Sequence, residues 1–447
     1  MSDLTTTLLD LATLPAADLP ERAMATAQAS LYDWLVCGRA GMGEPVAARL
    51  QALMAAEGGK PVASVFGAGK APARMAALVN GTISHALDFD DTHFAHVGHL
   101  SVAIYPAALA AGEAAGASAL EVVAGFLLGA EGAIRVGQML GSAHYNRGFH
   151  QTATAGAFGA TLAAARLLGL TRDEMRAALS LCSTRAAGLR SQFGTMGKPY
   201  NAGAAAANGV EAAQLAALGM TSCVDGLTGT QGFVDTHTDA PQPCVAPVGD
   251  WLLPANSYKF HACCHGTHAM IEALLALMPL DPAQVAGITL RTGPRWMSVC
   301  NIPTPATGLE VKFSYPWLAA MVLSGYDTSA FASYTQAVAT DAALTRLAAR
   351  VEVIADAQIG DMQAEQGPSC GGVTQGMQTG VLIVGSHAEL ECQFPHHGVD
   401  GRRIGQRLED GFILILPKRQ RLNAVGDEVF PNETQWGPSS RCLRFQS

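Results

Sequence analysis

Apolar residues recur every three or four positions through most of the first half of the chain, from about Leu19 to Leu218. Alanine-rich stretches with this spacing are separated by glycines and by short polar breaks. A period near 3.6 residues is typical of amphipathic helices, whose apolar face packs against a core. The pattern therefore predicts a series of helices that form one compact all-α domain.

The ends of some of these helices are marked by their capping residues. Gly169 ends the helix expected at residues 153–168, and Thr171 with Glu174 supplies a capping box for the next one. Asn201 is a favourable N-cap, so we expect another helix to begin near it and to end at Gly219. The residues just before Asn201 are then expected in a turn.

The pattern changes near Pro241, where glycine and proline surround short β-like runs. The runs 288–292 (ITLRT) and 351–354 (VEVI) indicate strands, while 268–278 and 317–323 indicate helices. Helices mixed with a few strands predict an α+β domain. We place the all-helical domain at residues 1–250 and the smaller α+β domain at residues 251–385.

The end of the chain differs from the rest in composition. Only 2 of the last 82 residues are alanine, against 77 of the first 365. The runs 381–384 (VLIV) and 412–416 (FILIL) are strand-like, and no closing amphipathic helix follows them. We treat residues 386–447 as an atypical segment; one interpretation is that it is encoded in a shifted reading frame.

The composition excludes some classes of protein. Hydrophobic residues make up 49% of the chain and charged residues 15%, so a large core can form and a mostly disordered protein is excluded. The 28 basic and 37 acidic side chains give a formal net charge of -9, which argues against nucleic-acid binding. A small anionic ligand stays compatible, because a few cations can line a pocket in an acidic protein.

The sequence favours a cytoplasmic protein with no membrane partner. The first residues lack a basic start and carry Asp3 and Asp10, and no stretch of ~18 apolar residues occurs without glycine, proline or charge. The ten cysteines include no CxxC pair, and the adjacent Cys263 and Cys264 rarely suit disulfide geometry. We therefore expect reduced thiols.

The densest polar cluster lies at residues 85–99 (HALDFDDTHFAHVGH), with four of the thirteen histidines and three aspartates. A solvated loop with capping aspartates is one interpretation. A metal site formed by His93, His96 and His99 is a second, although no specific metal-binding spacing is present. We favour the third, an acid–base loop, because titratable groups beside apolar helices can have shifted pKa values.

Two further stretches place polar groups beside predicted helix starts. His150 precedes the helix of residues 153–168, where free backbone N–H groups can meet an anion, although a lone histidine is more often a capping or packing residue. Lys198, one of six lysines, lies in a Gly/Pro turn before the next helix. The lysine and the start of the helix together predict a binding site for a carboxylate or a phosphate. An ordinary surface lysine is the alternative interpretation. The spacing is not that of a P-loop.

A second scarce lysine, Lys259, follows Tyr258 and precedes a stretch of histidines and cysteines, FHACCHGTH. His261, His265 and His268 permit a metal site. A structural turn between domains is the alternative interpretation.

In this order and at these separations, HALDFDDT, FHQTATAGAFGAT, FGTMGKPYNAGAAAANG and YKFHACCHGTH resemble signatures of the MmgE/PrpD family. The family includes 2-methylcitrate dehydratase, cis-aconitate decarboxylase and iminodisuccinate epimerase, and the resemblance covers about residues 1–360. It implies a mainly α fold, with a large all-helical domain, a smaller α+β lid domain and a cleft between them. It also implies that the C-terminal segment returns to the helical domain, that the protein is a homodimer, and that no metal or organic cofactor is needed.

The resemblance also implies roles for individual residues. Catalytic roles fall on Asp88, His99, His150, Lys198 and Lys259. Substrate-binding roles fall on Thr92, Gln151 and Tyr258.

These residue types suit proton transfer at a carbon next to a carboxylate. Such a step builds negative charge, and losing one donor that stabilises it typically costs ~3 kcal/mol. The two lysines suit the binding of substrate carboxylates, the two histidines suit proton transfer, and Asp88 suits the orientation of a histidine. We predict a cofactor-independent lyase or isomerase that acts on a small di- or tricarboxylic acid, with dehydration of the 2-methylcitrate type as the first choice.

Other functions stay open on the sequence alone. Decarboxylation of the cis-aconitate type and epimerisation of the iminodisuccinate type need nearly the same groups. A metal-dependent hydrolase built on the loop of residues 85–99 and a non-catalytic helical scaffold are the alternatives from other classes.

Overall fold

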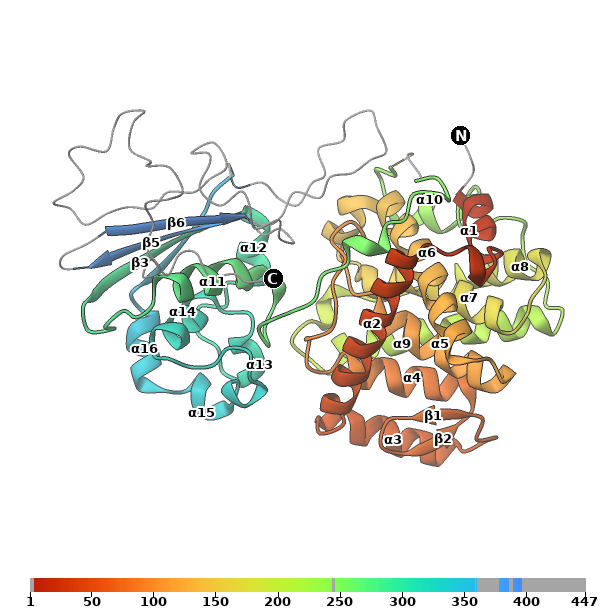
Figure 1. The fold of residues 1–447 in the computed structure, drawn as a ribbon, viewed down its shortest axis with the longest axis horizontal. Coiled ribbons are helices and arrows are strands. Elements are labelled where there is room, and N and C mark those ends of the chain that lie inside the picture. The colour runs from red at the N-terminus through yellow and green to blue at the C-terminus, as the bar shows by residue number, and fades with distance from the viewer. Residues whose placement is uncertain (1–3, 243–245, 358, 360–377, 386–388, 396–447) are drawn as a thin grey trace. The chain divides into compact units, whose positions relative to one another are not determined.

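The structure, a computed structural model, describes residues 4–242, 246–357, 359, 378–385 and 389–395. The described residues form two compact units, one that ends at Lys259 and one that begins at Phe260 (Figure 1). The domain boundaries expected from the sequence stay predictions. Most of the atypical segment 386–447, including the strand expected at 412–416, lies outside the described residues.

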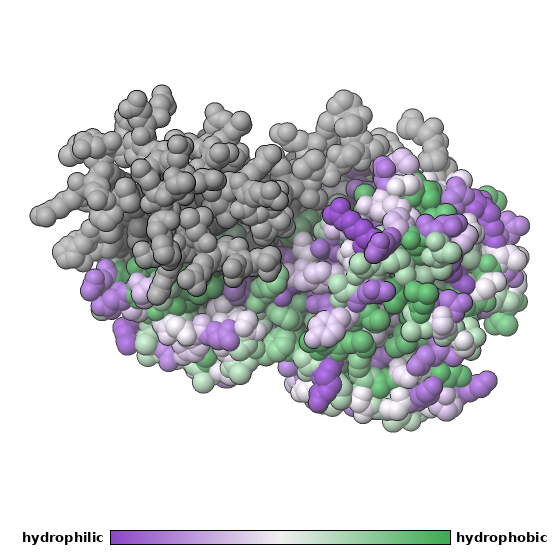
Figure 2. Space-filling view, in the orientation of Figure 1, coloured by the Kyte–Doolittle hydropathy of each residue, from purple (hydrophilic) through white to green (hydrophobic). Residues whose placement is uncertain are grey.

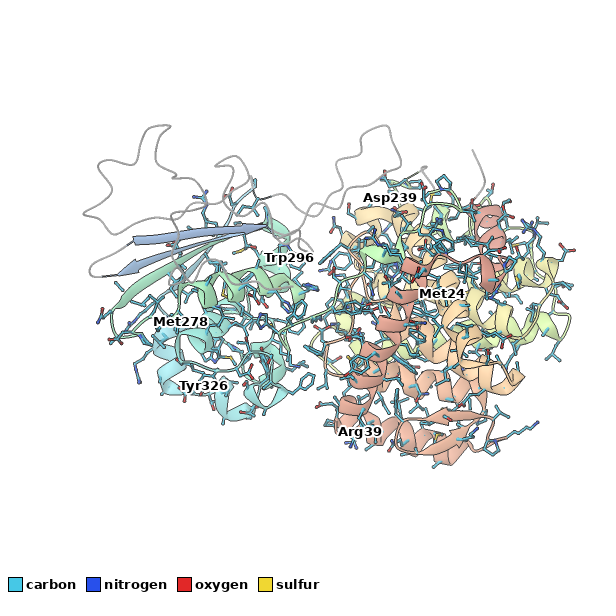
Figure 3. All side chains as sticks on the ribbon, in the orientation of Figure 1. Met24, Arg39, Asp239, Met278, Trp296 and Tyr326 are labelled. Carbon is cyan, nitrogen blue, oxygen red and sulfur yellow. The ribbon has the colours of Figure 1, made fainter. Side chains whose placement is uncertain are left out.

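The first unit consists mainly of helices, as the apolar spacing predicts. They are α1 (Leu4–Ala12), α2 (Glu21–Gly41), α3 (Pro45–Glu57), α4 (Ala73–Ser84), α5 (Ser101–Ala115), α6 (Ala119–Asn146), α7 (Gln151–Leu167), α8 (Arg172–Cys182), α9 (Gly197–Ala217) and α10 (Phe233–His237). The predicted capping box is confirmed, because Thr171 and Glu174 bond each other's backbone at the start of α8. Met24 of α2 packs against the core, whereas Arg39 and Asp239 lie at the surface (Figure 3).

The expectation of an all-helical unit is wrong in one place. Strands β1 (Ala63–Val65) and β2 (Gly69–Ala71) form an antiparallel hairpin between α3 and α4. The Asn80 amide on α4 holds it, donating to the carbonyl of Ser64 at 2.8 Å and accepting from the Phe66 N–H at 2.9 Å. Strands of three residues are too short to show alternation in the sequence, which explains why the pattern did not reveal them.

The centre of the helical unit is a set of closely packed helices, in which α5 and α9 contact each other and both contact α4 and α7. Glycines allow this approach: a Cβ on Gly81 of α4 would lie 2.8 Å from the Cα of Gly203 on α9 and 2.9 Å from the carbonyl oxygen of Val102 on α5. The contact places the C-terminal end of α4 beside the N-terminal end of α9. Those two ends carry the polar groups described below.

Gly81→Ala is expected to lower the free energy of unfolding by about 1–3 kcal/mol, although alanine is the better helix former, because the added methyl meets backbone atoms that cannot move aside. Thermal unfolding followed by circular dichroism measures the effect. Gly249→Ala is the matched control, because a Cβ there meets nothing within 4 Å. Equal melting temperatures for both variants would show that the α4–α9 approach is not tight.

The start of α9 differs from the prediction. The helix begins at Gly197, not near Asn201, so Lys198 lies in its first turn and not in a preceding turn. Pro199 suits a first helical turn, where its missing N–H costs nothing. Asn201 does not cap the helix, because its side-chain Nδ2 donates to the carbonyl of Leu189 at 3.1 Å and to Nδ1 of His150 at 3.2 Å.

The second unit contains a four-stranded sheet with helices packed on it (Figure 1). The strand order is β4-β3-β5-β6, with β3 parallel to β4 and antiparallel to β5, and β5 antiparallel to β6. In chain order the elements are α11 (His268–Leu277), β3 (Val285–Thr292), α12 (Pro294–Val299), α13 (Gly308–Val311), α14 (Tyr315–Leu323), α15 (Gln336–Ala339), α16 (Ala342–Ala348), β4 (Val351–Ala355), β5 (Gln378–Gly385) and β6 (Glu389–Pro395). The predicted strands at 288–292, 351–354 and 381–384 are confirmed, as are the helices at 268–278 and 317–323 to within two residues.

The surface of the helical unit is mixed in character. On the face drawn in Figure 2, hydrophilic side chains lie scattered among apolar ones. Among the described helices, none combines the length and the apolar character needed to cross a membrane.

Candidate active site

Asp88, in the loop after α4, contacts two lysines. Nζ of Lys198 donates to Oδ1 of Asp88 at 2.5 Å. Nζ of Lys259 donates to the main-chain oxygen of Asp88 at 2.5 Å and lies 3.4 Å from Oδ1. All three residues are at least 92% buried. Two of the scarce lysines, from distant parts of the chain, therefore share one carboxylate.

The backbone conformation and the charge of Asp88 both suit its contacts with two lysines. Its φ of 54° is left-handed, a conformation that aspartate tolerates better than most residues. In this conformation both the carbonyl and the carboxylate of Asp88 contact Lys259. Burial alone would raise the pKa of Asp88, but the ammonium groups of Lys198 and Lys259 outweigh it and hold the pKa well below its usual value. Asp88 therefore stays ionised, and the two lysines exceed it by one positive charge.

His85, directly after α4, forms a buried pair with Asp90. Nδ1 of His85 lies 2.8 Å from Oδ1 and 3.0 Å from Oδ2 of Asp90, so this nitrogen carries the proton and donates it to the carboxylate. Nε2 is then the lone-pair nitrogen; it is buried and has no hydrogen-bond partner within the described ranges. Burial lowers the pKa of His85 to about 4, against the opposite effect of Asp90. His85 is thus a neutral imidazole with one nitrogen able to accept a proton.

His99 lies between the two carboxylates of this loop. Its Nε2 is 3.7 Å from Oδ1 of Asp88, and its Nδ1 is 2.8 Å from Oδ2 of Asp90, although the ring N–H is not aligned with that oxygen for a hydrogen bond. The backbone N–H of His99 donates to Oγ1 of Thr152 on α7 at 3.0 Å, which fixes the end of the loop. The ring of His99 therefore lies within 4 Å of both carboxylates.

His150, the residue before α7, presents the opposite tautomer to His85. The Asn201 amide must point its nitrogen at His150, because the same nitrogen donates to a carbonyl oxygen, and Nδ1 of His150 is therefore an acceptor. In the neutral ring the proton then lies on Nε2. Burial, together with the nearby His85 and Lys198, holds the pKa of His150 well below its usual value. The rings of His150 and His85 stack with centroids 5.9 Å apart.

The five predicted catalytic residues thus come together in one unit. Together with the two residues that the sequence reasoning did not select, they form what we call the Asp88 cluster: His85, Asp88, Asp90, His99, His150, Lys198 and Lys259. His85 and Asp90 both lie in the polar stretch of residues 85–99. The signal that could have selected them is their position, five residues apart across the end of an apolar helix.

The three predicted substrate-binding residues lie in different surroundings. Oγ1 of Thr92 and Oε1 of Gln151 are buried and accept no hydrogen bond from any described residue. Each oxygen therefore keeps an unused acceptor capacity. The Tyr258 hydroxyl is engaged with α2, 2.9 Å from Oγ of Ser30 and donating to the carbonyl of Thr26 at 3.2 Å.

The segment that carries Lys259 is held by the neighbouring Asp91. The Asp91 carboxylate accepts from the Ser101 N–H at 3.0 Å, at the first residue of α5, and from Nδ2 of Asn256 at 2.7 Å. Thr92 and Ser257 exchange backbone hydrogen bonds of 2.8 and 2.9 Å. These contacts fix the residues just before Lys259 against the loop that carries Asp88.

Asp33→Asn is expected to make the protein more stable, and increasingly so as the pH rises. Oδ2 of Asp33 accepts from the Asp91 N–H at 3.0 Å, and burial, with Asp91 and Asp90 adding to it, raises the pKa of Asp33 to about 8. A raised carboxyl pKa means that the folded state holds a proton that the unfolded state releases above its pKa of 3.8, so stability falls as the pH rises from about 4 to 8.

The asparagine variant keeps the hydrogen-bond acceptor without this titration. Its advantage over the wild type should grow by at most about 1.4 kcal/mol per pH unit, less in practice because Asp33 is only half-buried. Urea unfolding at pH 5, 6.5 and 8 measures it. A constant difference between the two proteins across that range would contradict the prediction.

The metal site that the sequence suggested at His93, His96 and His99 does not form among the described residues. His93 and His96 do not join His99, because their rings lie 3.0 Å from the carbonyl oxygen of Leu252 and 3.1 Å from that of Ala133. Instead, in the part of the chain that the structure describes, one group places ligand atoms within 4.8 Å of one another: His85, Asp88, Asp90 and His99. The two ammonium groups on Asp88 oppose a divalent cation there.

The histidines of the second unit are not gathered for metal binding either. The His261 ring lies 2.8 Å from Oε1 of Glu272 and 2.8 Å from Oγ1 of Thr328. With His265 and His268 it forms no group of metal-ligand geometry among the described residues. Among the described residues, Cys37, Cys182 and Cys223 are free thiols.

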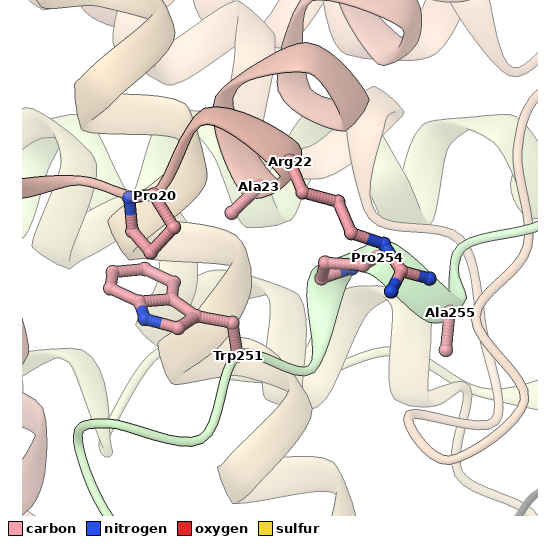
Figure 4. A pocket seen from close by; sticks show the side chains of 6 residues that line it. All are labelled: Pro20, Arg22, Ala23, Trp251, Pro254 and Ala255. Carbon is pink, nitrogen blue, oxygen red and sulfur yellow. The ribbon is translucent and has the colours of Figure 1, made fainter.

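A pocket of about 380 Å³ lies elsewhere on the helical unit (Figure 4). The side chains that line it are Pro20, Arg22, Ala23, Trp251, Pro254 and Ala255. None of them belongs to the Asp88 cluster.

A mainly helical unit in which lysines, carboxylates and neutral imidazoles are buried together has the make-up of an acid–base site for an anion. The chain belongs to the MmgE/PrpD family. Residues 11–245 match the MmgE/PrpD N-terminal domain, and residues 261–400 match the MmgE/PrpD C-terminal domain.

Several curated relatives are similar to this chain. The cis-aconitate decarboxylase-like protein oryM of Aspergillus oryzae is 30% identical over 295 residues, which cover 61% of this chain and 61% of that protein. The cis-aconitate decarboxylase of Aspergillus terreus is 31% identical over 289 residues, or 60% of this chain and 59% of its own length. The cis-aconitate decarboxylase of Homo sapiens is 30% identical over 275 residues, which cover 57% of this chain and 56% of that protein. The matched part thus spans less than two thirds of the length of these relatives.

Proposed function

We propose that the chain is a cofactor-independent lyase that decarboxylates a small tricarboxylic acid of the cis-aconitate type. The observation that carries this proposal is the pair of buried ammonium groups on Asp88, next to three buried or half-buried imidazoles. The names of the curated relatives favour decarboxylation over the dehydration that the sequence put first. Dehydration of the 2-methylcitrate type and epimerisation use similar groups and are outcomes of the test below.

Lys198 and Lys259 are the proposed carboxylate-binding groups. When a carboxylate leaves as CO₂, its bonding electron pair passes to the carbon skeleton and spreads into a remaining carboxylate. That carboxylate then carries more negative charge than in the bound substrate, so a fixed cation stabilises the transition state more than the ground state. Both ammonium groups are already held in place by Asp88, which lowers the cost of positioning them during the reaction.

The histidines are the proposed proton-transfer groups. The carbon skeleton holds the electron pair that the departing CO₂ leaves behind, so a proton must be delivered to it, and a positioned side chain typically accelerates such a transfer about 10²–10⁴-fold. His99, between Asp88 and Asp90, can hold a proton in transit. The Nε2 atoms of His85 and His150 supply an acceptor and a donor, respectively, at fixed positions.

Proton NMR in deuterated water tests the proposal. The protein is incubated separately with cis-aconitate, 2-methylcitrate, citrate and iminodisuccinate. We expect cis-aconitate to be consumed with release of CO₂ and the product to carry one deuterium at the newly protonated carbon. Turnover of 2-methylcitrate alone would establish a dehydratase instead, and no turnover or deuterium exchange in any of the four would contradict a lyase function.

A metal-dependent hydrolase is separated from this proposal by a chelator arm of the same experiment. Dialysis against EDTA should leave the rate unchanged, because Asp88 is neutralised by lysines and not by a metal ion. A loss of activity that added Zn²⁺ restores would favour the metal site formed by His85, Asp88, Asp90 and His99. The expected homodimer and the cytoplasmic location stay predictions.

A further inference from the structure

Arg190 is a cation at the edge of the Asp88 cluster that the preceding mechanism does not use. It opens the short 3₁₀ turn Arg190–Gln192 before α9. Its guanidinium carbon lies 3.9 Å from the centre of the Tyr145 ring, and Nη1 donates to the carbonyl of Tyr145 at 3.1 Å. Stacking and a hydrogen bond therefore hold the side chain in one orientation.

The guanidinium still has unused donors. The Nε atom of Arg190 is buried and donates to no described residue, and the Tyr145 carbonyl is its one hydrogen-bond acceptor in the described part of the chain. A carboxylate partner is also absent among the described residues, unlike for Arg74, Arg135 and Arg172. A buried donor without an acceptor destabilises a fold, so its presence calls for an explanation.

The position of Arg190 connects it to the cluster through Phe193. The Phe193 ring lies 5.9 Å from the guanidinium carbon and 5.2 Å from Nζ of Lys198, and its edge packs on His150 with centroids 4.9 Å apart. Lys198 and Arg190 are thus no further apart than the sum of those two distances. Two carboxylates of one six-carbon acid can bridge such a span.

The backbone fixes this arrangement. The Arg190 N–H donates to the carbonyl of Gly148 at 2.8 Å, and the His150 N–H donates to the carbonyl of Gly188 at 3.0 Å. The turn that carries Arg190 is therefore bonded on both sides to the segment that ends in His150. Arg190 and His150 keep their relative positions without a ligand.

We propose that Arg190 is a specificity-determining residue, whose Nε–Nη2 edge binds a further carboxylate of the substrate while Lys198 and Lys259 bind the reacting end. A guanidinium presents two parallel N–H groups that match a carboxylate, which a lysine cannot do. This assignment rests on the proposed function. It makes the protein selective for tricarboxylates over dicarboxylates of the same carbon chain.

Calorimetric titration with two non-reacting probes tests this. Tricarballylate carries three carboxylates, and glutarate is the same chain without the middle one. We expect the wild type to prefer tricarballylate, and Arg190→Gln to reduce that preference about tenfold, or ~1.4 kcal/mol. Arg172→Gln, at a surface ion pair with Asp10, is the matched control and should keep the wild-type preference.

Arg190→Lys separates binding from a structural role. Lysine keeps the charge and the contact with the Tyr145 ring but lacks the two parallel donors. If Arg190 binds a carboxylate, the lysine variant also loses most of the preference; a lysine variant with the wild-type preference would overturn the inference. If both probes bind the wild type and Arg190→Gln weakens them equally, the inference fails while the proposed function stands. If neither probe binds the wild type, both fail.

Discussion

Lys198→Met is expected to lower kcat/KM about 10²–10³-fold while leaving the melting temperature unchanged or higher. The activity falls because the substitution removes a fixed positive charge from the place where negative charge develops. The stability is kept because Asp88 retains Lys259, 3.4 Å from its Oδ1, so no buried charge is left alone. Because two lysines share one carboxylate, removing one of them leaves a matched buried pair and not an unpaired charge, so the change in stability should be small.

Steady-state decarboxylation and thermal unfolding of the same preparations measure both parts of this prediction. Lys60→Met is the matched control, because Lys60 is exposed and outside the cluster. An unchanged kcat/KM in the Lys198 variant would remove this lysine from the site. A lost activity accompanied by a large fall in melting temperature would instead assign Lys198 a structural role.

Asp88→Asn is expected to abolish activity and, in contrast, to destabilise the fold by about 3–5 kcal/mol. The two ammonium groups would face each other across an uncharged amide, and removing the carboxylate from a buried ion pair is strongly unfavourable. Activity falls because neither lysine is then held in its orientation. Both variants are therefore expected to lose activity, but only Asp88→Asn is expected to lose stability.

The comparison is made by urea unfolding at pH 7 together with the activity assay. Asp18→Asn, at an exposed aspartate of the helical unit, is the control and should change neither quantity. A stable, inactive Asp88 variant would show that the lysines have further anionic partners. An active variant would exclude Asp88 from catalysis.

Much of the fold could be predicted because its signals are local. The capping box at Thr171 and Glu174 and the strands 288–292 and 351–354 depend on neighbouring residues, and each is confirmed. The start of α9 was missed for a tertiary reason. Asn201 has the propensity of an N-cap, but its amide is used on His150 and Leu189, so the helix begins four residues earlier.

The candidate site could also be predicted only in part: its residue types are local signals, and its contacts are tertiary. The types of residue that could form it were visible as polar stretches, because scarce lysines and clustered histidines stand out in an apolar, alanine-rich chain. Their pairing was not visible. That Lys259 contacts the main-chain oxygen of Asp88, and that His85 has Asp90 as its partner while His93 bonds a carbonyl, depends on the left-handed backbone at Asp88 and on the packing of α4 against α9.

The buried state of His85 and His150 also bears on where such a protein can work. Burial keeps the pKa of His85 near 4 and holds that of His150 well below its usual value, so acidification from pH 7 to about 5.5 leaves the His85 ring uncharged. The lone-pair nitrogen of His85 thus remains an acceptor at a pH that would protonate a solvent-exposed histidine.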